Sequence, residues 1–516
     1  MKQEMMEIEF IAAANGYLGY LRDESRLSGR ADNIVFPEDV SQARAAIRRA
    51  ADERIPLTIQ GARTGVAGGA VPNGGLILST ERMNRPLGFA DGDVPILRVQ
   101  GGTSFDGVTN LLSQGIPPDD WDAETKALFR KRARSLRFPP NPTETTASVG
   151  GAFACGARGP NVLRWGGVAD HVQGLVWLTP TGELWRVERG RYYFDETGCS
   201  LPDGKRLSCD TGLPDGGVRF LHPRPGLDLV DFLEGSEGLL GFAAELSLRL
   251  EEKPSAVWGV VYFFEQDRAA IDFAETLRRR RERGFESEAL STLEYYDRPT
   301  LELIRSAAPQ SATLRRLPFV NPLMDAAVQV ELEGNDSEAL EAVLTEHLEL
   351  FLASGGGEEN TWAAASPAEL EKFHLLRHAA PELINTELDK IRQVSPDLRK
   401  TAMDFMVPPE LVGMYRETYR RDMEEEGLRG FVFGHIAEGR LHVNLLPENS
   451  DELSRCRVLI DRWADSVVRD RGLLTAENGV GRLKRNLFCR HLRPERLEQI
   501  RFILRAFDPN KLLGGF

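Results

Sequence analysis

The segment from Gln60 to Ala70 (QGARTGVAGGA) has the composition of a phosphate-binding loop, and it follows an apolar run that predicts a buried strand. Its four glycines permit positive φ and a close approach of the backbone, so successive N–H groups can point at a pyrophosphate. The spacing differs from the GxGxxG pattern of Rossmann domains. On its own, the segment fits a structural turn equally well.

A second segment suited to ligand binding runs from Phe138 to Pro160 (FPPNPTETTASVGGAFACGARGP). Its prolines fix an extended entry, and its Thr and Ser hydroxyls can form hydrogen bonds. Gly150 and Gly151 leave room for a flat ligand against the backbone. Considered alone, an ordinary surface loop rich in Pro, Thr and Gly would look the same.

The N-terminal half of the chain alternates strand-like and helix-like segments that would position these two loops. A helix is predicted over 37–54, where apolar residues recur with helical periodicity. Residues 190–226 are rich in Gly, Pro, Asp and Arg and are interpreted as a long excursion. Short buried strands are predicted at 55–61, 74–80, 97–101 and 172–178.

Beyond Pro254 the pattern changes to repeats of a strand followed by a helix. Two further strands flank a predicted tight turn at Glu438–Gly439. This order predicts a second α+β domain in which helices cover one face of an antiparallel sheet. The predicted strands lie at 256–265 and 326–334, and the predicted helices at 267–283, 337–352 and 451–471.

Length and composition limit the class of protein. A chain of 516 residues favours two large domains or three smaller ones. With 41% hydrophobic and 28% charged residues, it has the balance of a folded globular protein. The formal net charge of -14 disfavours binding to nucleic acid or anionic lipid. A small anionic substrate remains compatible, because a few Arg residues can dominate one pocket.

The cysteines and the N-terminus bear on location. The five cysteines are scattered without a CxxC motif, which indicates reduced thiols. The first ten residues carry acids where a signal peptide would be basic. No run approaches the roughly 18 apolar residues of a membrane span. The expected location is the cytoplasm.

Seven segments along the chain carry a resemblance to a known family: GARTGVAGGAVPNGGLILSTERMN, PPNPTETTASVGGAFA, ADHVQGLVWLTPTGEL, FLEGSEGLLGFAAELSLRL, FGHIAEGRLHVNLLP, AENGVGRLKR and FDPNKLL. In order and spacing they resemble the FAD-linked oxidases of the vanillyl-alcohol oxidase superfamily. The branch is that of D-lactate dehydrogenase, D-2-hydroxyglutarate dehydrogenase and the flavin subunit of glycolate oxidase. The resemblance covers residues 30–513, with a weak stretch at 190–225.

The fold implied by this resemblance is α+β. A two-part PCMH-type FAD-binding domain would occupy residues 1–255. An α+β cap (substrate) domain with a ferredoxin-like antiparallel sheet would occupy 256–470. The segment 471–516 would complete the active site and return to the FAD domain.

The resemblance also implies FAD as the cofactor. The pyrophosphate would be held by Gly61, Arg63, Thr64, Gly65, Gly68 and Gly69. The ribityl chain and isoalloxazine would be lined by Pro140, Thr143, Ser148, Gly150 and Gly151, and the other end of the cofactor bordered by Gly238 and Leu240. Relatives with covalent flavin commonly carry a His in the first loop, whereas no His precedes His171 here, so FAD is expected without a covalent link. A bond to Cys155 is a minor alternative.

A divalent metal site is a further implication. The two His of the family's HxGDGNxH motif correspond to His435 and His442, and the Glu of GEHGIG corresponds to Glu477. Two imidazoles and one carboxylate suit zinc or manganese and leave positions for a substrate hydroxyl and carboxylate. The histidines are seven residues apart, so a turn must fold the chain back between them. Two ordinary half-buried histidines are the alternative.

Asn478 stands where the family has the His that is expected to take the hydroxyl proton. A neutral amide can orient a substrate but cannot accept a proton near neutral pH. Three explanations remain open. A metal lowers the hydroxyl pKa so that water takes the proton; another group, such as His374, His378 or Glu438, reaches in; or the chemistry has been lost or changed.

A carboxylate substrate also requires a cation. Arg377, in FHLLRHAAPELI, matches the family segment that holds such an Arg, and Lys400 is a second candidate. For both, a solvated helix charge is the alternative. Arg440 stands where the family has Asn; it either recognises a second acidic group or replaces part of the metal's electrostatic role.

These residues lead to the hypothesis of an FAD-dependent dehydrogenase of a small D-2-hydroxy acid, with hydride passing to flavin N5. Electrons would then pass to a quinone, a flavoprotein or an iron–sulfur partner, and a homodimer is an open expectation. The alternatives are a flavin-binding electron-transfer subunit with little activity of its own, suggested by Asn478, and an oxidase of an unrelated alcohol or amine. Fold alone does not separate them.

Overall fold

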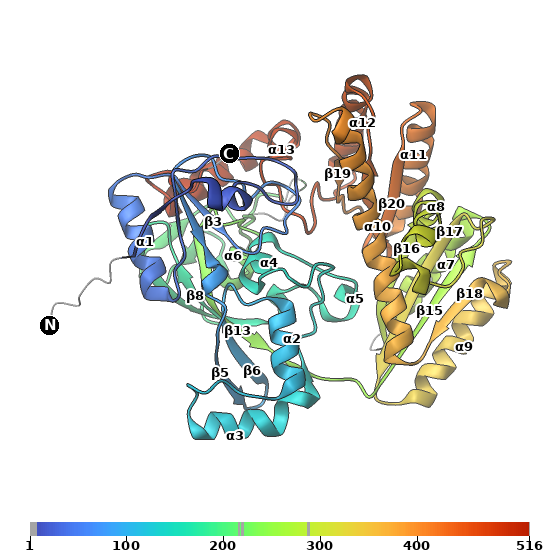
Figure 1. Ribbon diagram of the computed structural model, residues 1–516, viewed down its shortest axis with the longest axis horizontal. Coiled ribbons are helices and arrows are strands. Elements are labelled where there is room, and N and C mark those ends of the chain that lie inside the picture. Colours follow the sequence, from blue (N-terminus) through green and yellow to red (C-terminus); the bar gives the residue numbers. More distant parts are fainter. Residues whose placement is uncertain (1–7, 215–216, 218–220, 286–288, 515–516) are drawn as a thin grey trace. The chain divides into compact units, whose positions relative to one another are not determined.

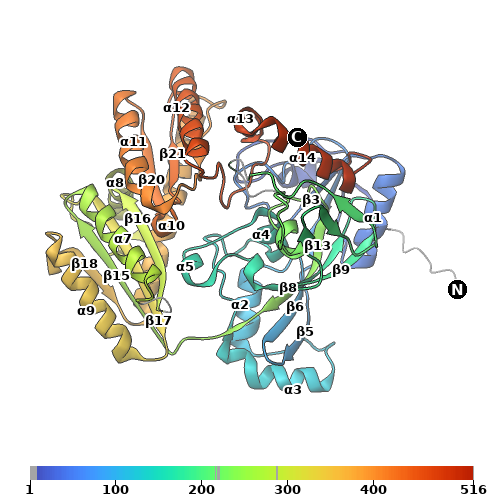
Figure 2. The same cartoon turned by 180° about the vertical axis from the view of Figure 1, so that it is seen from behind.

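A computed structural model describes residues 8–514 except 215–216, 218–220 and 286–288 (Figures 1 and 2). The chain forms two compact units. The first comprises Met1–Gly159, Gly167–Lys253 and Glu477–Phe516, and the second comprises Pro160–Gly166 and Pro254–Ala476. The C-terminal segment therefore returns to the unit formed by the N-terminal half.

A four-stranded sheet in the first unit carries the first glycine-rich loop. Its strand order is β1-β2-β4-β3, and β2, β4 and β3 run parallel. Helix α1 (Val40–Asp52) packs through a stripe of buried alanines and Ile47. It begins three residues later than predicted, because the Asp39 carboxylate accepts a hydrogen bond from Gln42 N at 2.9 Å and caps the helix. The strands are β1 (Ile11–Ala12), β2 (Asn33–Val35), β3 (Leu57–Gln60) and β4 (Leu76–Ser79).

A five-stranded antiparallel sheet of order β5-β6-β13-β8-β9 is the largest sheet of this unit among its described residues. Its strands are β5 (Pro86–Asp91), β6 (Pro95–Gln100), β8 (Val172–Leu178), β9 (Leu184–Glu188) and β13 (Phe242–Arg249). The α-helices are α2 (Phe105–Gln114), α3 (Ala123–Arg132), α4 (Val149–Cys155), α6 (Leu229–Leu233), α13 (Arg485–His491) and α14 (Pro494–Phe507). Leu57 N donates to Leu512 O at 2.7 Å, which ties the C-terminal segment to β3.

The excursion predicted over 190–226 contains a small antiparallel sheet in its described part. Its strands are β10 (Phe194–Asp195), β11 (Gly198–Ser200) and β12 (Arg206–Ser208). An alternating pattern of apolar and polar residues cannot indicate strands of two or three residues, because the pattern hardly repeats within that length.

The second unit is built on a seven-stranded sheet of order β18-β15-β17-β16-β20-β21-β19, in which all described pairings are antiparallel. This confirms the antiparallel sheet predicted for the cap. The strands are β15 (Ala256–Phe264), β16 (Leu290–Asp297), β17 (Ala326–Gly334), β18 (Thr361–Ala364), β19 (Thr401–Met403), β20 (Gly430–His435) and β21 (His442–Leu445). The α-helices are α5 (Val162–Trp165), α7 (Asp267–Glu282), α8 (Arg298–Ala307), α9 (Ser337–Ala353), α10 (Pro367–Val394), α11 (Val412–Glu425) and α12 (Ser450–Arg469).

Helices cover both faces of this sheet, so the expectation of one covered face is wrong. Phe263 of β15 belongs to a core shared with α8 and α10. Its neighbours Tyr262 and Phe264 point the other way and meet Phe273 of α7 and Phe351 of α9 at centroid distances of 5.0–5.5 Å. Six consecutive buried residues end β15, and such a continuous apolar run is typical of a strand buried on both faces.

Helix α10 carries one of the predicted substrate-binding residues across the sheet. It begins in a capping box, in which the Ser366 side chain accepts from Glu369 N and the Glu369 side chain accepts from Ser366 N. Pro381 lies inside the helix and cannot donate to the Arg377 carbonyl one turn earlier. This interrupts the regular helical pattern next to Arg377.

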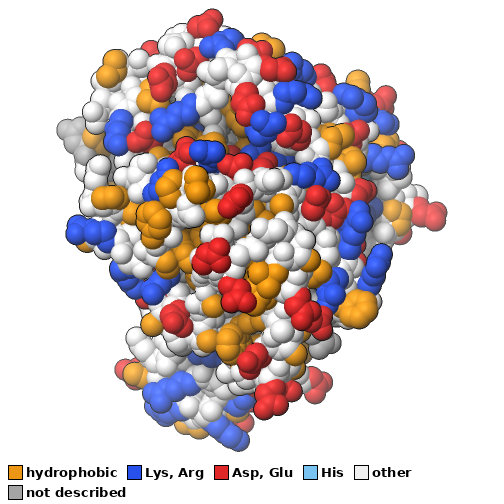
Figure 3. All heavy atoms as spheres, turned by 90° about the vertical axis from the view of Figure 1, so that its right-hand side faces the viewer, with side chains coloured by type: hydrophobic (Ala, Val, Ile, Leu, Met, Phe, Trp, Pro, Cys, Tyr) orange, Lys and Arg blue, Asp and Glu red, His pale blue; other side chains and the backbone are white. Residues whose placement is uncertain are grey.

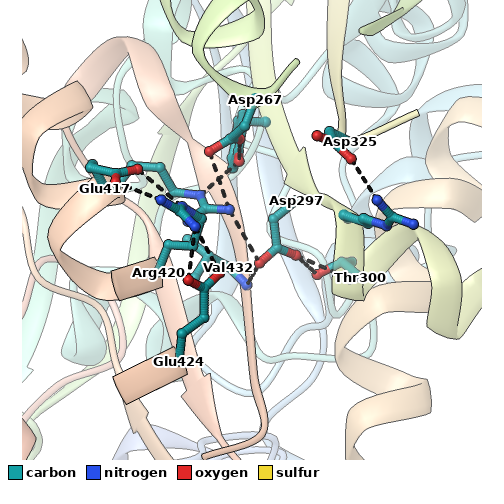
Figure 4. Close-up of polar contacts among 11 residues, drawn as sticks. Asp267, Asp297, Thr300, Asp325, Glu417, Arg420, Glu424 and Val432 are labelled. Carbon is teal, nitrogen blue, oxygen red and sulfur yellow. Dashed lines mark hydrogen bonds and ion pairs between the residues drawn. The ribbon is translucent and has the colours of Figure 1, made fainter. Parts of the chain in front are cut away.

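A buried ionic network lies where β16, α8 and β20 meet (Figure 4). Asp297 accepts hydrogen bonds from Thr300 N at 3.0 Å and Oγ1 at 2.6 Å, which caps α8, and from Val432 N at 2.9 Å, which ties in β20. Arg416 of α11 approaches Asp297 at 3.9 Å and Asp267 at 3.3 Å. Burial raises the pKa of Asp297 to about 6, although Arg416 and Thr300 oppose the shift.

We expect the pKa of Asp297 to make stability fall as pH rises from about 4 to about 6. The folded protein binds more protons than the unfolded chain in this window, so the contribution is present below pH 3.8 and is lost as pH passes the folded pKa of about 6. The free energy of unfolding that is lost across this window is on the order of 3 kcal/mol. Unfolding midpoints are measured at several pH values across this window. They should depend less on pH in Asp297→Asn than in the wild type. Parallel profiles would contradict the assignment.

Charges of both signs are mixed on the face drawn in Figure 3. Figure 3 shows acidic and basic side chains interspersed with hydrophobic ones on the side that it presents. The net charge of -14 is therefore not gathered into one acidic face on that side. Within the described residues, no helix has the length and apolar character needed to cross a membrane.

Candidate active site

A buried cluster of three side chains lies on the α10 face of the second unit's sheet. Glu294 and His435 are direct partners in the β16–β20 pairing, so their side chains lie side by side. The His435 Nδ1 contacts Glu294 Oε1. From α10, the Arg377 Nε donates to Glu294 Oε2 at 2.8 Å. Glu294 is 0% exposed, His435 3% and Arg377 5%, so all three groups are removed from water.

Glu294 is ionised in this cluster. Burial alone would raise the pKa of Glu294, but the charges of His435 and Arg377 and the hydrogen bond from His435 outweigh burial and lower it to about 2. A carboxylate can only accept hydrogen bonds, so the His435 Nδ1 carries the proton that it donates. When the charged ring gives up its Nε2 proton, that nitrogen carries the lone pair, as in carboxylate–histidine–metal arrangements.

His442 lies beside His435 because the chain turns back between them. His442 pairs with Phe433, two residues before His435, which puts both histidines on one face of the sheet. Their ring centroids are 5.6 Å apart, and the Arg377 Nη2 is 3.5 Å from the His442 Nε2. The turn has Gly439 at φ +71°, a left-handed conformation that favours glycine. The predicted turn at Glu438–Gly439 is confirmed.

Glu477 follows a segment that is anchored in the second unit. The Asp404 carboxylate accepts from Thr475 Oγ1 at 2.8 Å and from Ala476 N at 3.0 Å. One potential ligand atom from each of His435, His442 and Glu477 lies within 4.8 Å of the others. Two nitrogens and one carboxylate oxygen are ligand types that zinc and manganese accept.

The loop that follows Glu477 is held by Glu237 in the first unit. The Glu237 carboxylate accepts from Val480 N at 2.6 Å and from Gly481 N at 2.7 Å. Gly479 has φ +68°, and a Cβ there would come within 2.8 Å of the Glu237 Cδ, so only glycine fits. These contacts fix the backbone on the C-terminal side of Asn478.

The other predicted site residues have varied surroundings. Arg440 is fully buried, and its Nη2 forms an ion pair with Glu438 inside the turn. The Lys400 Nζ donates to Asn385 Oδ1 of α10 at 2.8 Å. Among the proposed bases on α10, His374 is exposed and His378 is half-buried.

The buried side chain of Gln60, at the start of the first glycine-rich loop, is hydrogen-bonded to the end of that loop. The Gln60 Nε2 donates to Tyr20 O and to Ala70 O, both at 2.7 Å. The Arg63 guanidinium lies over the Tyr20 ring at 4.1 Å, and Arg63 itself has φ +62°. A Cβ at Gly65 would meet nothing within 4 Å, so open space adjoins the loop where the cofactor is predicted. Thr64, Gly68 and Gly69 lie in the same loop.

The second loop meets the first through small residues. A Cβ at Gly61 would lie 2.4 Å from Ser148 Oγ, and a Cβ at Gly150 would lie 2.7 Å from Gly101 O. The Ser148 Oγ accepts from Gly151 N at 3.2 Å and caps α4. Close packing of the backbone is thus one reason for these small residues, and the role of this loop in binding flavin stays a prediction. Pro140 and Thr143 lie in the described stretch before α4.

Two other predictions concern Gly238 and Leu240, placed at the other end of the cofactor, and the thiol of Cys155. Gly238 has φ +77°, and Leu240 is fully buried, with its carbonyl accepting from Trp177 Nε1 at 3.2 Å. Burial, with smaller contributions from Glu237 and Asp23, raises the pKa of the Cys155 thiol to about 12. A protonated thiol is a poor nucleophile, and FAD without a covalent link stays a prediction.

Glu294, Glu237 and Asp404 are the site residues that the sequence analysis missed. Each holds a predicted site residue or the segment next to one. The available signal for Glu294 was a single acid inside the otherwise strand-like run ALSTLEYY. An isolated buried acid in a strand requires hydrogen-bonding partners elsewhere in the fold.

Two glycine-rich loops pack together in one unit, and a buried cluster of histidine, arginine and carboxylate lies in the other. Residues 254–515 match the family model described as FAD linked oxidases, C-terminal domain, and residues 31–120 match that of an FAD binding domain. The chain therefore belongs to the FAD-linked oxidase family, and FAD is its cofactor.

Two relatives and one solved structure illustrate the similarity. The chain is 24% identical to the D-lactate dehydrogenase of Anaerostipes hadrus, over 96% of this chain and 91% of the relative. It is 25% identical to the D-2-hydroxyglutarate dehydrogenase of Xanthomonas citri pv. viticola, over 93% and 88%. An alkyldihydroxyacetonephosphate synthase structure aligns with TM-score 0.59 at 14% identity, covering 94% of this chain and 76% of that one, which shows the shared fold.

Proposed function

We propose that the protein is an FAD-dependent dehydrogenase of a small D-2-hydroxy acid. The observation that carries the proposal is the buried cluster of Arg377, Glu294 and His435. A buried guanidinium held at Nε by a carboxylate can still bind a substrate carboxylate in bidentate fashion through its terminal nitrogens. The names of the relatives, D-lactate and D-2-hydroxyglutarate dehydrogenase, agree with a substrate that carries a carboxylate.

The chain's own residues would bind and orient the substrate. Arg377 would bind the C1 carboxylate, with His442 and His435 next to it, and Asn478 would donate a hydrogen bond from its amide. His435, His442 and Glu477 would hold a divalent metal, zinc or manganese. When bound, FAD supplies the hydride acceptor at N5, and the metal supplies a Lewis acid that lowers the pKa of a hydroxyl.

Arg440 and Lys400 would have smaller parts in substrate binding. The charge of Arg440 is paired with Glu438, so recognition of a second acidic group would need that pair to open. Lys400 is held by Asn385 near α10, from where it would add to the positive potential of the substrate site. Electrons would leave for a quinone, a flavoprotein or an iron–sulfur protein, in the cytoplasm.

A second candidate function is a flavin-binding electron-transfer subunit with little hydroxy-acid activity of its own. Asn478 favours it, because the amide cannot take the hydroxyl proton. A steady-state assay with an artificial electron acceptor, run over a panel of D- and L-2-hydroxy acids on FAD-replenished protein, separates the two. Turnover with one or a few D-acids supports the dehydrogenase, and no turnover across the panel supports the subunit.

Replacing Asn478 with His is expected to increase turnover with D-lactate or D-2-hydroxyglutarate by about tenfold. A positioned base contributes about 10²–10⁴-fold, but an introduced imidazole lacks tuned surroundings, so a smaller gain is expected. The rate should rise with pH as the new imidazole loses its proton. Asn478→Gln keeps the amide and serves as the control. Equal rates in the two variants would contradict this explanation of Asn478.

A further inference from the structure

We propose that Glu294 is the positioning residue of this site: its carboxylate fixes the Nδ1–H tautomer of His435 and restrains Arg377 through Nε, so that both meet a carboxylate-bearing ligand in one orientation. The inference rests on the proposed function. It assigns part of the site's specificity to a side chain that does not itself touch the substrate.

The first observation is that Glu294 joins two elements that are distant in sequence. Arg377 is 83 residues away on α10, and His435 is 141 residues away at the end of β20. Each carboxylate oxygen accepts from a different donor, Oε1 from His435 and Oε2 from Arg377. One fully buried group on the central strand β16 therefore sets the distance between the two side chains.

The second observation is that only an ionised carboxylate can make both contacts. An amide at this position would offer one acceptor oxygen and one NH₂ group, and the NH₂ would face a donor on either His435 or Arg377. Either one buried donor would lose its partner, which is costly away from water, or His435 would have to take the other tautomer, with its proton on Nε2.

The third observation is that Arg377 is restrained on several sides. Its Nε is bound to Glu294, its Nη2 lies 3.5 Å from the His442 Nε2, and its guanidinium lies 5.2 Å from the centroid of the Phe433 ring. A guanidinium held in this way loses little conformational freedom when a carboxylate binds its terminal nitrogens. Loss of the contact between Glu294 and the Arg377 Nε should therefore weaken carboxylate binding, although the Arg377 cation remains.

The test measures the binding of oxalate, a carboxylate ligand with no C–H bond from which hydride could leave, to the FAD-loaded protein by calorimetry. Glu294→Gln is expected to raise the oxalate Kd by about 10–100-fold, the range typical when a group that orients ligand-binding residues is lost. Glu294→Asp keeps the charge at a shorter reach and should weaken binding by less, about threefold or more. Thermal midpoints and FAD content establish that each variant is folded.

Glu331→Gln is the matched control. Glu331 is also a buried acid on the α10 face of this sheet, on the adjacent strand β17, and it accepts from Gln329 Nε2 at 2.8 Å. The control should bind oxalate within about twofold of the wild type. Unchanged binding in Glu294→Gln, an equal loss in Glu331→Gln, or no oxalate binding by the wild type would overturn the inference.

Failure of the proposed function would look different. In that case oxalate would bind in a manner that depends on Glu294, while no D-2-hydroxy acid would turn over in the panel assay. If Glu294→Gln does not fold, the oxalate Kd of the folded Glu294→Asp variant tests the proposal instead. A merely structural role of Glu294 predicts that this Kd equals that of the wild type.

Discussion

Replacing Arg377 with Met is expected to lower kcat/KM for the hydroxy acid by about 10²–10³-fold, mostly through a higher KM. The side chain is 5% exposed, so its contact with a substrate carboxylate would be shielded from water. Truncating one partner of such a charge pair costs about 2–5 kcal/mol, and each 1.36 kcal/mol is tenfold in rate. Arg377→Lys keeps the charge but loses the planar fork, so it should recover only part of the loss.

Arg429→Met is the control for this experiment. Arg429 lies over the Phe431 ring at 5.3 Å, much as Arg377 lies over Phe433 at 5.2 Å, but it is more exposed and pairs with Glu387 at 3.0 Å. Its replacement should leave kcat/KM within about twofold, because exposed ion pairs contribute little. Equal losses in the two variants would show that the effect of Arg377 comes from general destabilisation.

Removal of the proposed metal is expected to lower turnover by about 10³-fold, since a bound cation contributes several kcal/mol of charge stabilisation. The measurement is metal content and turnover before and after dialysis against a chelator, followed by addition of zinc or manganese. His442→Ala should lose both metal and turnover, whereas the protein's FAD content should remain. Protein without stoichiometric metal whose activity survives chelation would contradict the metal proposal.

The sequence predicted the elements whose signals are local. The turn between β20 and β21 has a Glu–Gly pair between two apolar runs, and the structure has Gly439 at φ +71° there. Helices α7 and α9 were predicted to within one residue at each end, because their apolar residues repeat with helical spacing. The glycine-rich loops stood out by composition.

Features that depend on the fold as a whole could not be predicted in this way. Glu294 acquires its role only because β16 pairs with β20 and α10 crosses the same face. The long helix α10 was missed because Pro381 and charged residues interrupt its apolar pattern. The burial of both sheet faces likewise follows from packing. A single acid within a strand gives no indication of which distant donors it will meet.

We propose that a carboxylate-binding site held by Glu294 presents a D-2-hydroxy acid to FAD. The most direct measurement is anaerobic mixing of FAD-replenished protein with D- and L-2-hydroxy acids while the oxidised flavin absorbance is followed. We predict complete bleaching by at least one D-acid, little by its L-enantiomer, and slow bleaching at equal concentration in Arg377→Met. Absorbance that stays unchanged with every acid, or that falls equally with both enantiomers, would contradict the account.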